Sequence, residues 1–447
     1  MKTFFYGCPE FFAPYCTLQQ LLFKFDFQWS HQQVYYGCQY SDGRKKELER
    51  FLYQYSHALK LENEGSHVIV YSDESWSNTG TSFDNAWIHK CDKSNPNQCY
   101  ACSKFIEWSN GNDTKAKISK SNTGKRVVFL HAFSKDGLIL NYPAIDHFYP
   151  TFDEIENFNI NLKTAEYIFE CKNDHKNDYH EQMDADKYVN WFKNRLIPTC
   201  KSIFNNKTVI LFIDQAPFHV SSSEFPLTSD NKNEIIKYYD KYNIKQIQVI
   251  RNNFNANQIL TFERISFNKN KNNIGPSKDE LYNYLYLYLK KYNPTAIEPI
   301  ISKIAREHGY LVLYSCPNNP EDQPAEFLNA HVKLMVKKRA KKNRTIMELK
   351  QDVREGFYGG KTIVGRDHQG INAKMIEGWR KKCHDHMNNE ISSILGLNNT
   401  NIRNLWDNSS QYKINDPFLR ISRTNKTLVE FSKQFKIIIS SLGLGTT

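Results

Sequence analysis

The sequence predicts an α/β fold, and two observations support this. Three short β-branched runs, at residues 68–71, 127–130 and 209–213, have the composition of buried strands. A helical pattern over residues 185–196, which we expect Pro198 to end, separates the second run from the third. Strands that follow one another through a helical crossover are typical of α/β sheets.

The elements on either side of these runs extend the same pattern. An amphipathic, charged helix without Gly or Pro is expected at residues 44–61, directly before the first strand. After the third strand we expect helices, one more strand at residues 310–314, and then a helix that Glu326 opens. The predicted helices of this second half cover residues 231–242, 278–291 and 297–308, and the chain after Glu326 stays helical to about residue 395.

The composition is that of a folded, soluble and basic protein. The chain has 447 residues, of which 40% are hydrophobic, 24% charged and 14% aromatic, so it has room for two or three domains. No run approaches the roughly 20 apolar residues that span a bilayer, and the first residues lack a signal peptide, so no membrane partner is expected. Ten scattered cysteines are too dilute for a disulfide framework. The formal charge of +11 favours a polyanionic partner.

Three acidic residues occupy positions where a ligand site can form. Asp73 and Asp214 follow the first and third strands, and Glu326 opens a helix. Groups beyond the carboxyl ends of strands can converge in an α/β sheet, and converging carboxylates repel one another unless a cation lies between them. Hard ions such as Mg²⁺ or Mn²⁺ prefer such oxygen ligands. The alternative is that these acids are turn formers or helix caps, which is common at strand ends.

The sequence around the three acids resembles the DDE transposases of the mariner type. Five blocks occur in the family's order, and each is weak by itself. They lie at residues 71–76, 124–137, 178–198, 213–219 and 313–333. Trp379, Cys383 and His386 also resemble the closing helix of that family. The match covers roughly residues 66–390 and retains all three acids.

The resemblance implies an RNase H-like mixed sheet flanked by helices, which binds two divalent ions, Mg²⁺ or Mn²⁺. The family hydrolyses DNA at transposon ends and transfers the freed strand into target DNA. Carried over to this chain, Asp73, Asp214 and Glu326 are the catalytic residues and metal ligands. The implied partner is DNA, the expected assembly is a homodimer, and the expected location is the nucleus.

Some positions depart from the family pattern. Gln215 follows the second aspartate where the family usually has Asn, and Asp322 replaces an apolar residue in the loop before Glu326. The chain between Asp214 and Glu326 is also long, which indicates a mostly helical insertion at about residues 220–308 before the last catalytic element. These departures leave an alternative open, a catalytically inactive or domesticated descendant that binds DNA.

The resemblance also divides the chain into segments. Residues 1–62 are expected to be a helical remnant of a helix-turn-helix module with a linker helix, shorter than the front part usual in the family. Residues 63–395 are the expected catalytic domain, and residues 396–447 a C-terminal tail.

Basic residues follow Glu326 on the same or the next helix, close enough to contact DNA phosphates beside the cut site. The alternative is a solvated charged face. The residues predicted to bind DNA are Lys333, Lys337, Lys338, Arg339, Lys341 and Lys342.

Two further clusters contain potential metal ligands. A polar stretch holds one CxxC pair and could bind a structural zinc, but a loop with free thiols is favoured, because only one such pair exists. Its four residues are His89, Cys91, Cys99 and Cys102. In the second cluster only Cys383 and His386 share a helix face, so we expect these two to pack in the core and His384 and Asp385 to be solvated.

Overall fold

The computed structural model describes residues 42–81, 124–141, 164–171, 183–227, 230–253, 256–268, 275–317, 319–341, 343–361 and 367–408, together with residue 414. The candidate zinc cluster at residues 89–102, the first 41 residues, Lys342 and most of the C-terminal tail lie outside them.

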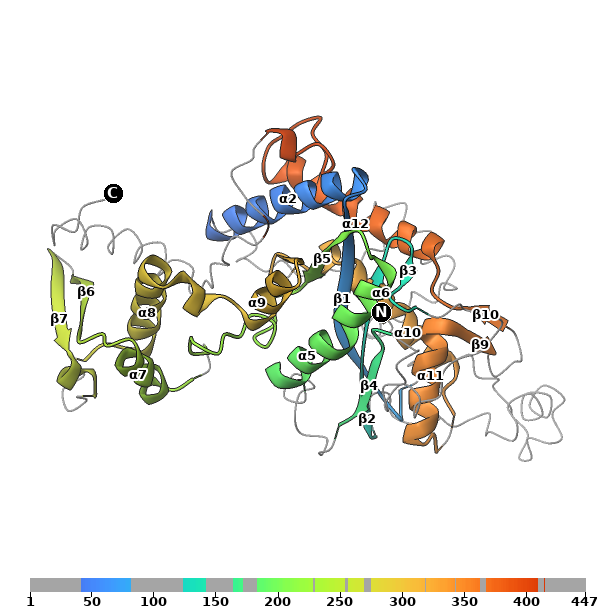
Figure 1. The fold of residues 1–447 in the computed structure, drawn as a ribbon, viewed down its shortest axis with the longest axis horizontal. Helices are drawn as coiled ribbons and strands as arrows, with labels where there is room; N and C mark the ends of the chain where they lie inside the picture. Colours follow the sequence, from blue (N-terminus) through green and yellow to red (C-terminus); the bar gives the residue numbers. More distant parts are fainter. Residues whose placement is uncertain are drawn as a thin grey trace, which may run out of the picture.

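A mixed sheet forms the centre of the molecule (Figure 1). Its strands are β1 (His67–Asn78), β2 (Arg126–Ser134), β3 (Gly137–Leu138), β4 (Tyr167–Glu170), β5 (Thr208–Ile213) and β8 (Leu311–Tyr314). The order is β3-β2-β1-β5-β8, and β4 pairs with the other end of β2. β1, β5 and β8 run parallel to one another, whereas β2 is antiparallel to β1. The predicted α/β, RNase H-like mixed sheet flanked by helices is therefore confirmed.

Alternating side chains of the strands build a separate hydrophobic core on each face of the sheet. One face carries Ile69, Tyr71 and Phe212 and packs against α2 (Asp42–Asn63), α10 (Pro324–Lys338), α11 (Ile346–Tyr358) and α12 (Ala373–Ser393). The other face carries Val70 and Leu211. It packs against α5 (Ala185–Trp191), the π-helical turn η4 (Phe192–Leu196), α6 (Ile197–Ile203) and α9 (Ile300–Glu307).

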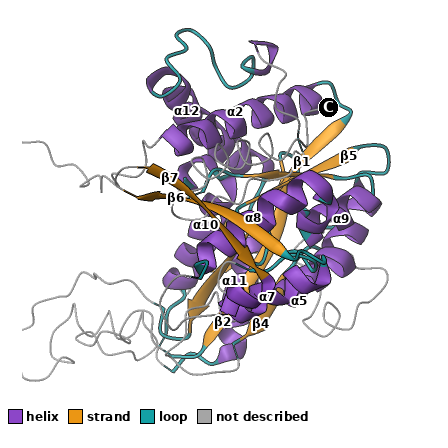
Figure 2. Cartoon of the chain, turned by 90° about the vertical axis from the view of Figure 1, so that its left-hand side faces the viewer, coloured by secondary structure: helices purple, strands orange, loops and turns teal. Residues whose placement is uncertain are grey.

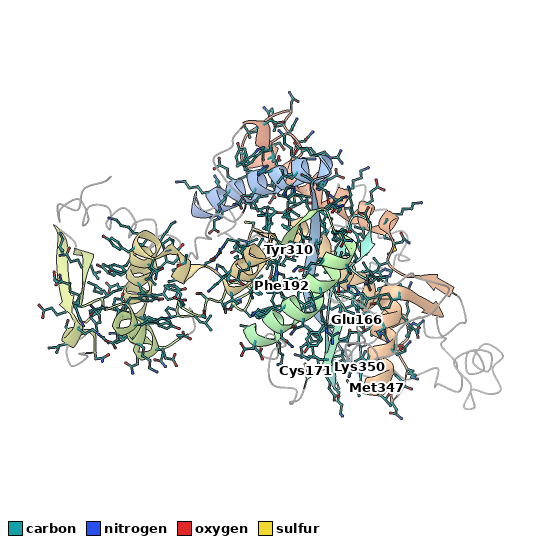
Figure 3. All side chains as sticks on the ribbon, viewed as in Figure 1. Glu166, Cys171, Phe192, Tyr310, Met347 and Lys350 are labelled. Atoms are coloured by element: carbon teal, nitrogen blue, oxygen red, sulfur yellow. The ribbon has the colours of Figure 1, made fainter. Side chains whose placement is uncertain are left out.

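A buried ion pair adds a polar contact to the helix-covered sheet. Glu166, immediately before β4, lies 3.1 Å from the Arg354 guanidinium of α11, and both side chains are almost fully buried. Figure 3 shows Glu166 between the strands and α11, and Phe192 and Tyr310 inside the core on the opposite side of the sheet. Moving α11 away from the sheet would leave both charges buried without a partner, which is costly. The pair therefore holds α11 in place relative to the sheet.

The insertion between β5 and β8 has a hydrophobic core of its own. It contains α7 (Lys232–Lys241), an antiparallel hairpin of β6 (Gln246–Asn253) and β7 (Ala256–Glu263), the turns η5 (Arg264–Asn268) and η6 (Pro294–Ile297), and α8 (Lys278–Tyr292). In Figures 1 and 2 the hairpin and its two helices lie beside the central sheet, connected to it through α9. The predicted helices are present, but the hairpin was not predicted.

The remaining elements follow the predicted pattern with local differences. Pro198 does not end the helix at residue 196, because the π-helical turn η4 continues directly into α6, whose first turn contains Pro198. The helix that carries Glu326, α10, begins at Pro324, two residues before this glutamate. The shorter elements are η7 (Pro320–Asp322), β9 (Gly359–Lys361), β10 (Asp367–Gln369) and η8 (Trp406–Asn408). Among the described helices, none combines the length and apolar character needed to cross a bilayer.

Candidate active site

The sheet register places Asp73 and Asp214 at the same level of two neighbouring parallel strands. Tyr71 of β1 pairs with Phe212 of β5, and each aspartate follows its paired residue by two positions. β5 ends at Ile213, so Asp214 lies directly beyond its carboxyl end, whereas β1 continues and pairs with β2 alone. Both carboxylates therefore lie where ligand sites form in α/β sheets.

Helix α10 supplies the third acid from the side. Glu326, Asn329 and Lys333 are spaced by three and four residues, so they share one face of the helix. The Asn329 side chain donates a hydrogen bond of 2.8 Å from Nδ2 to Oδ2 of Asp73, which docks this face on β1. The Lys333 ammonium lies 5.4 Å from the centre of the Trp76 ring, also on β1.

The charges of the three carboxylates act on one another. Burial raises the pKa of Asp73 well above its ordinary value, and the charges of Glu74, Asp214 and Glu326 raise it further. Burial also raises the pKa of Glu326; Lys333 opposes this shift, and Asp214 adds to it. Asp73, Asp214 and Glu326 thus lie close enough for their charges to act on one another, and we call these three residues the acidic cluster.

A buried histidine that the sequence reasoning missed compensates part of this negative charge. Nδ1 of His219 donates to Oδ1 of Asp214, and Nε2 lies 3.5 Å from Oε2 of Glu74. Burial alone would lower the pKa of His219, but Asp214 and Glu74 raise it to about 10. The ring also packs on Tyr188, with centroids 4.1 Å apart. His219 is therefore a fixed positive charge beneath the acidic cluster.

By its chemistry the donor set suits hard divalent cations, because it consists of three carboxylates. Of the described residues, Asp73, Asp214 and Glu326 do not bring one ligand atom each to within 4.8 Å of one another. A single small ion needs ligands that close. In this structure the three carboxylates are therefore not gathered around one common point.

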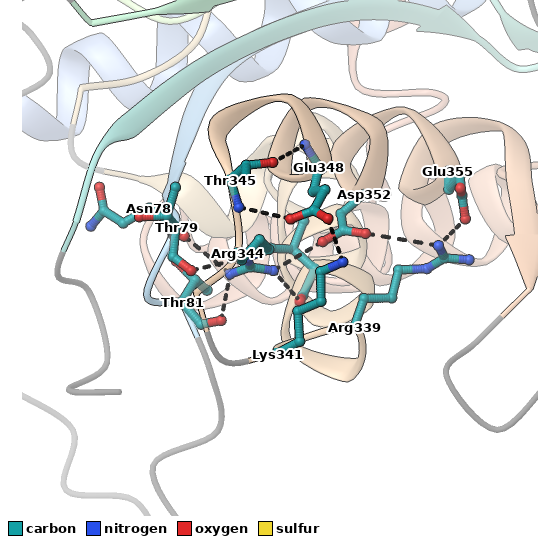
Figure 4. A network of polar contacts seen from close by, with 11 residues as sticks. Asn78, Thr79, Thr81, Arg339, Lys341, Arg344, Thr345, Glu348, Asp352 and Glu355 are labelled. Atoms are coloured by element: carbon teal, nitrogen blue, oxygen red, sulfur yellow. Dashed lines mark hydrogen bonds and ion pairs between the residues drawn. The ribbon is translucent and has the colours of Figure 1, made fainter. Parts of the chain in front are cut away.

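Arg344 holds the end of β1 against the helices that carry the site (Figure 4). Its guanidinium donates hydrogen bonds to the main-chain oxygens of Asn78, the last residue of β1, and of Thr79 and Thr81 beyond it. It also donates to the carbonyl of Val336 in α10 and to Asp352 in α11. These bonds are 2.7–3.1 Å long. All five N–H groups have acceptors, so this arginine is a structural connector.

The predicted DNA-binding residues occupy different environments. Arg339 is 8% exposed and forms ion pairs with Asp352 and Glu355, and Lys341 lies 2.6 Å from Glu348 (Figure 4). Lys333 lies within the acidic cluster, where burial lowers its pKa while Glu326 and Asp73 oppose that shift. Lys337 and Lys338 form the last turn of α10, and the Lys338 side chain is exposed.

Helix α12 differs from its predicted arrangement. Cys383 is buried in the core, as expected. His384, expected in solvent, is instead hydrogen-bonded through Nε2 to the hydroxyl of Tyr55 at 3.1 Å, because α12 crosses α2 at this point. His386 does not pack among apolar side chains but faces Asp322 and Glu390.

Glu74, His219 and Asn329 are the site residues that sequence reasoning did not find. A weak signal existed for each, since Glu74 adjoins Asp73, His219 follows Asp214 by five residues, and Asn329 lies one helical turn after Glu326. Polar residues next to candidate ligands are common, however, and only the fold shows that these three are buried against the acids.

No family model matches the sequence, and no curated protein is similar to it. Over most of its length the chain is similar to solved structures of Mos1 transposase. A Mos1 strand transfer complex is 10% identical, with a TM-score of 0.34 over 85% of this chain and 69% of that chain. A Mos1 paired-end complex with the left transposon end is 11% identical, with a TM-score of 0.37 over 82% and 68%. A Mos1 mariner paired-end complex with Mn is 11% identical, with a TM-score of 0.36 over the same shares.

These TM-scores are below 0.5. The function proposed below therefore rests on this chain's own residues.

Proposed function

We propose that this protein is a DDE transposase of the mariner type, a divalent-metal-dependent enzyme that cuts DNA at transposon ends and joins the freed strand to a target. The observation that supports it most is the convergence of Asp73, Asp214 and Glu326 from three elements far apart in the sequence. The proposed cofactor is a pair of Mg²⁺ or Mn²⁺ ions. The proposed assembly is a homodimer acting in the nucleus.

The chain's own residues would prepare this chemistry by holding the acids in place. Asn329 orients Asp73, His219 fixes one oxygen of Asp214, and Lys333 lies beside Glu326. When bound, divalent ions supply activation of the attacking oxygen and stabilisation of the leaving oxygen. Lys337 and Lys338, at the end of the helix that carries Glu326, would contact phosphates of the DNA next to the cut.

Nicking of supercoiled plasmid in the presence of Mg²⁺ or Mn²⁺ tests the proposal. Asp214→Asn keeps the side-chain volume and removes one charged ligand, so we expect nicking to fall at least about 100-fold, since even outer-shell changes cost 10–100-fold. Asp385→Asn is the matched control, because Asp385 lies exposed on α12. Nicking by Asp214→Asn at the rate of the control would refute the assignment.

A second candidate function is DNA binding without cleavage. Two observations favour it: the ion pair with His219 occupies Oδ1 of Asp214, and Asp322 departs from the family pattern in the loop before Glu326. Such a protein would retain DNA in EDTA with a steep salt dependence and would release no cleaved product with either metal. Metal-dependent cleavage that Asp214→Asn abolishes would exclude it.

A further inference from the structure

A second group of potential metal ligands lies away from the three acids, where the loop before α10 meets α12. In the described part of the chain, Asp322, His386 and Glu390 are the group whose ligand atoms all lie within 4.8 Å of one another. Nε2 of His386 is 3.8 Å from Oδ1 of Asp322 and 3.6 Å from Oε1 of Glu390. His386 and Glu390 are four residues apart and therefore share one face of α12.

In each of these three residues one buried polar atom lacks a hydrogen-bond partner. Oδ1 of Asp322, Nε2 of His386 and Oε2 of Glu390 are all inaccessible to solvent and unbonded. The Asp322 side chain is 0% exposed and that of Glu390 11%. Two buried carboxylates are costly to hold side by side, and the His386 imidazole that faces them at 3.6 and 3.8 Å can supply at most one positive charge, so the arrangement favours a further positive charge between them.

A neighbouring amide fixes the two carboxylates. Nδ2 of Asn319 donates one hydrogen bond of 2.6 Å to Oδ2 of Asp322 and another of 2.8 Å to Oε1 of Glu390. Outer-shell donors of this kind orient carboxylate ligands in metal centres. The amide holds the carboxylates side by side and leaves Oδ1 of Asp322 and Oε2 of Glu390 unbonded.

We propose that Asp322, His386 and Glu390 bind a structural transition-metal cation, Zn²⁺, distinct from the ions of the candidate active site. Imidazole nitrogen and carboxylate oxygen both bind Zn²⁺, and two carboxylates neutralise its charge. Ligands about 2.0–2.1 Å from tetrahedral zinc lie roughly 3.3–3.4 Å apart, slightly less than the 3.6 and 3.8 Å separations seen here. The His386 side chain is 37% exposed, so the group lies near the molecular surface.

The position of this site indicates a structural role for the cation at the start of α10. Asp322 ends η7, and α10 begins two residues later and carries Glu326 in its first turn. Zinc would therefore tie the loop before Glu326 to α12 and fix the start of the catalytic helix. Asp322, which replaces an apolar residue of the family pattern, would then be the residue that allows zinc to tie this loop to α12.

The test measures zinc bound by the full-length protein after dialysis against EDTA, incubation with ZnCl₂ and desalting. We expect His386→Gln and Glu390→Gln each to lose one equivalent of zinc relative to the unmodified protein, or to bind it at least about tenfold more weakly in calorimetry. Glu377→Gln and Asp385→Asn, both exposed on α12, are matched controls that should keep it. Asp214→Asn should also keep it, which separates this site from the candidate active site.

If His386→Gln, Glu390→Gln and the controls bind the same amount of zinc with the same affinity, the proposal is overturned. Any zinc in the unmodified protein would then be bound at another site. Co²⁺ provides a measurement that does not depend on a destabilising variant. The unmodified protein should give the intense visible absorption of tetrahedral or five-coordinate cobalt. Bands that remain those of the hexaaquo ion would also contradict the site.

Discussion

Arg344 shows how much a single buried side chain contributes to this fold. Its five hydrogen bonds connect the chain after β1, the last turns of α10, and α11, and its side chain is 0% exposed. No other side chain can replace this planar guanidinium with its five donors, because the ammonium of lysine has only three donors and is not planar.

Arg344→Ala should therefore lower the free energy of unfolding by about 3–5 kcal/mol, since Asp352 loses a buried partner. The measurement is urea unfolding followed by circular dichroism. Lys341→Ala is the control, because the exposed Lys341–Glu348 pair should contribute no more than about 1 kcal/mol. A loss in Arg344→Ala as small as that of the control would contradict the structural role of this arginine.

The lowered pKa of His384 predicts that the protein loses stability in mild acid. Burial, together with Arg380 and Arg403, lowers its pKa to about 4, whereas the unfolded chain keeps a pKa near 6.5. Below pH 6.5 the unfolded state therefore binds a proton that the folded state does not, and stability falls until the pH reaches about 4. From pH 7 to pH 5 this residue should cost about 1–2 kcal/mol.

Urea unfolding at pH 7 and pH 5 measures this effect. His384→Gln should reduce the difference in unfolding free energy between the two pH values. His308→Gln should leave it unchanged, because His308 lies at the exposed end of α9. An unchanged difference in His384→Gln would show that this histidine is not kept neutral in the folded state.

Among the elements, α10 and α11 form the closest helix contact next to the site. Gly356 of α11 faces Val332 of α10, and a Cβ added at Gly356 would lie 3.1–3.2 Å from atoms of Val332. This close approach keeps α10, with Glu326, near the sheet. On α12, by contrast, a Cβ added at Gly378 would have no atom within 4 Å.

Glycine-to-larger substitutions at these two positions should act in opposite directions. Gly356→Leu should lower the thermal midpoint and the rate of metal-dependent nicking, because α10 must move away from α11. Gly378→Ala should raise stability by up to about 1 kcal/mol, since alanine has the higher helix propensity and meets no obstacle. Calorimetry and the plasmid assay measure both effects; unimpaired Gly356→Leu would show that the helices are not held by this contact.

At the scale of the whole molecule, exposed lysines lie on both faces of the sheet, but only those on one face are near the acidic cluster. Lys337 and Lys338 end α10, on the face that carries the acidic cluster, whereas Lys303 lies exposed on α9, which packs on the opposite face. Formal charge alone, +11, does not distinguish these positions.

Lys337→Glu with Lys338→Glu should weaken DNA binding and lower the salt dependence of log K by about one unit for each phosphate that the variant no longer neutralises. The comparison is Lys303→Glu, which also reverses an exposed charge but should leave the salt slope unchanged. Fluorescence anisotropy with a DNA duplex at several salt concentrations measures both. Equal slopes in all three proteins would mean that DNA does not pass along the end of α10.

Much of the central fold could be predicted from local patterns. The β-branched runs at β1, β2, β5 and β8 and the helices of the second half lie where periodicity indicates them. The hairpin of β6 and β7 was missed, because its apolar runs at residues 246–250 and 258–262 are short and flank an Asn-rich stretch that obscures the strand signal. Ile247, Val249 and Phe262 become a buried face only through packing with α7 and α8, so tertiary contacts decide this element.

The sequence by itself determined the alternation of strands and helices, the position of Asp214 after a strand and that of Glu326 near a helix start, because these depend on neighbours a few residues away. It placed Asp73 at the end of the first strand, whereas β1 continues to Asn78. Only the tertiary structure decided the partners of the buried charges. His219 meets Glu74, and Asp322 meets His386 and Glu390, through strand register and helix docking between distant segments. The physical reason is that the cost of a buried charge depends on which groups surround it, and those groups are brought together only when the chain folds.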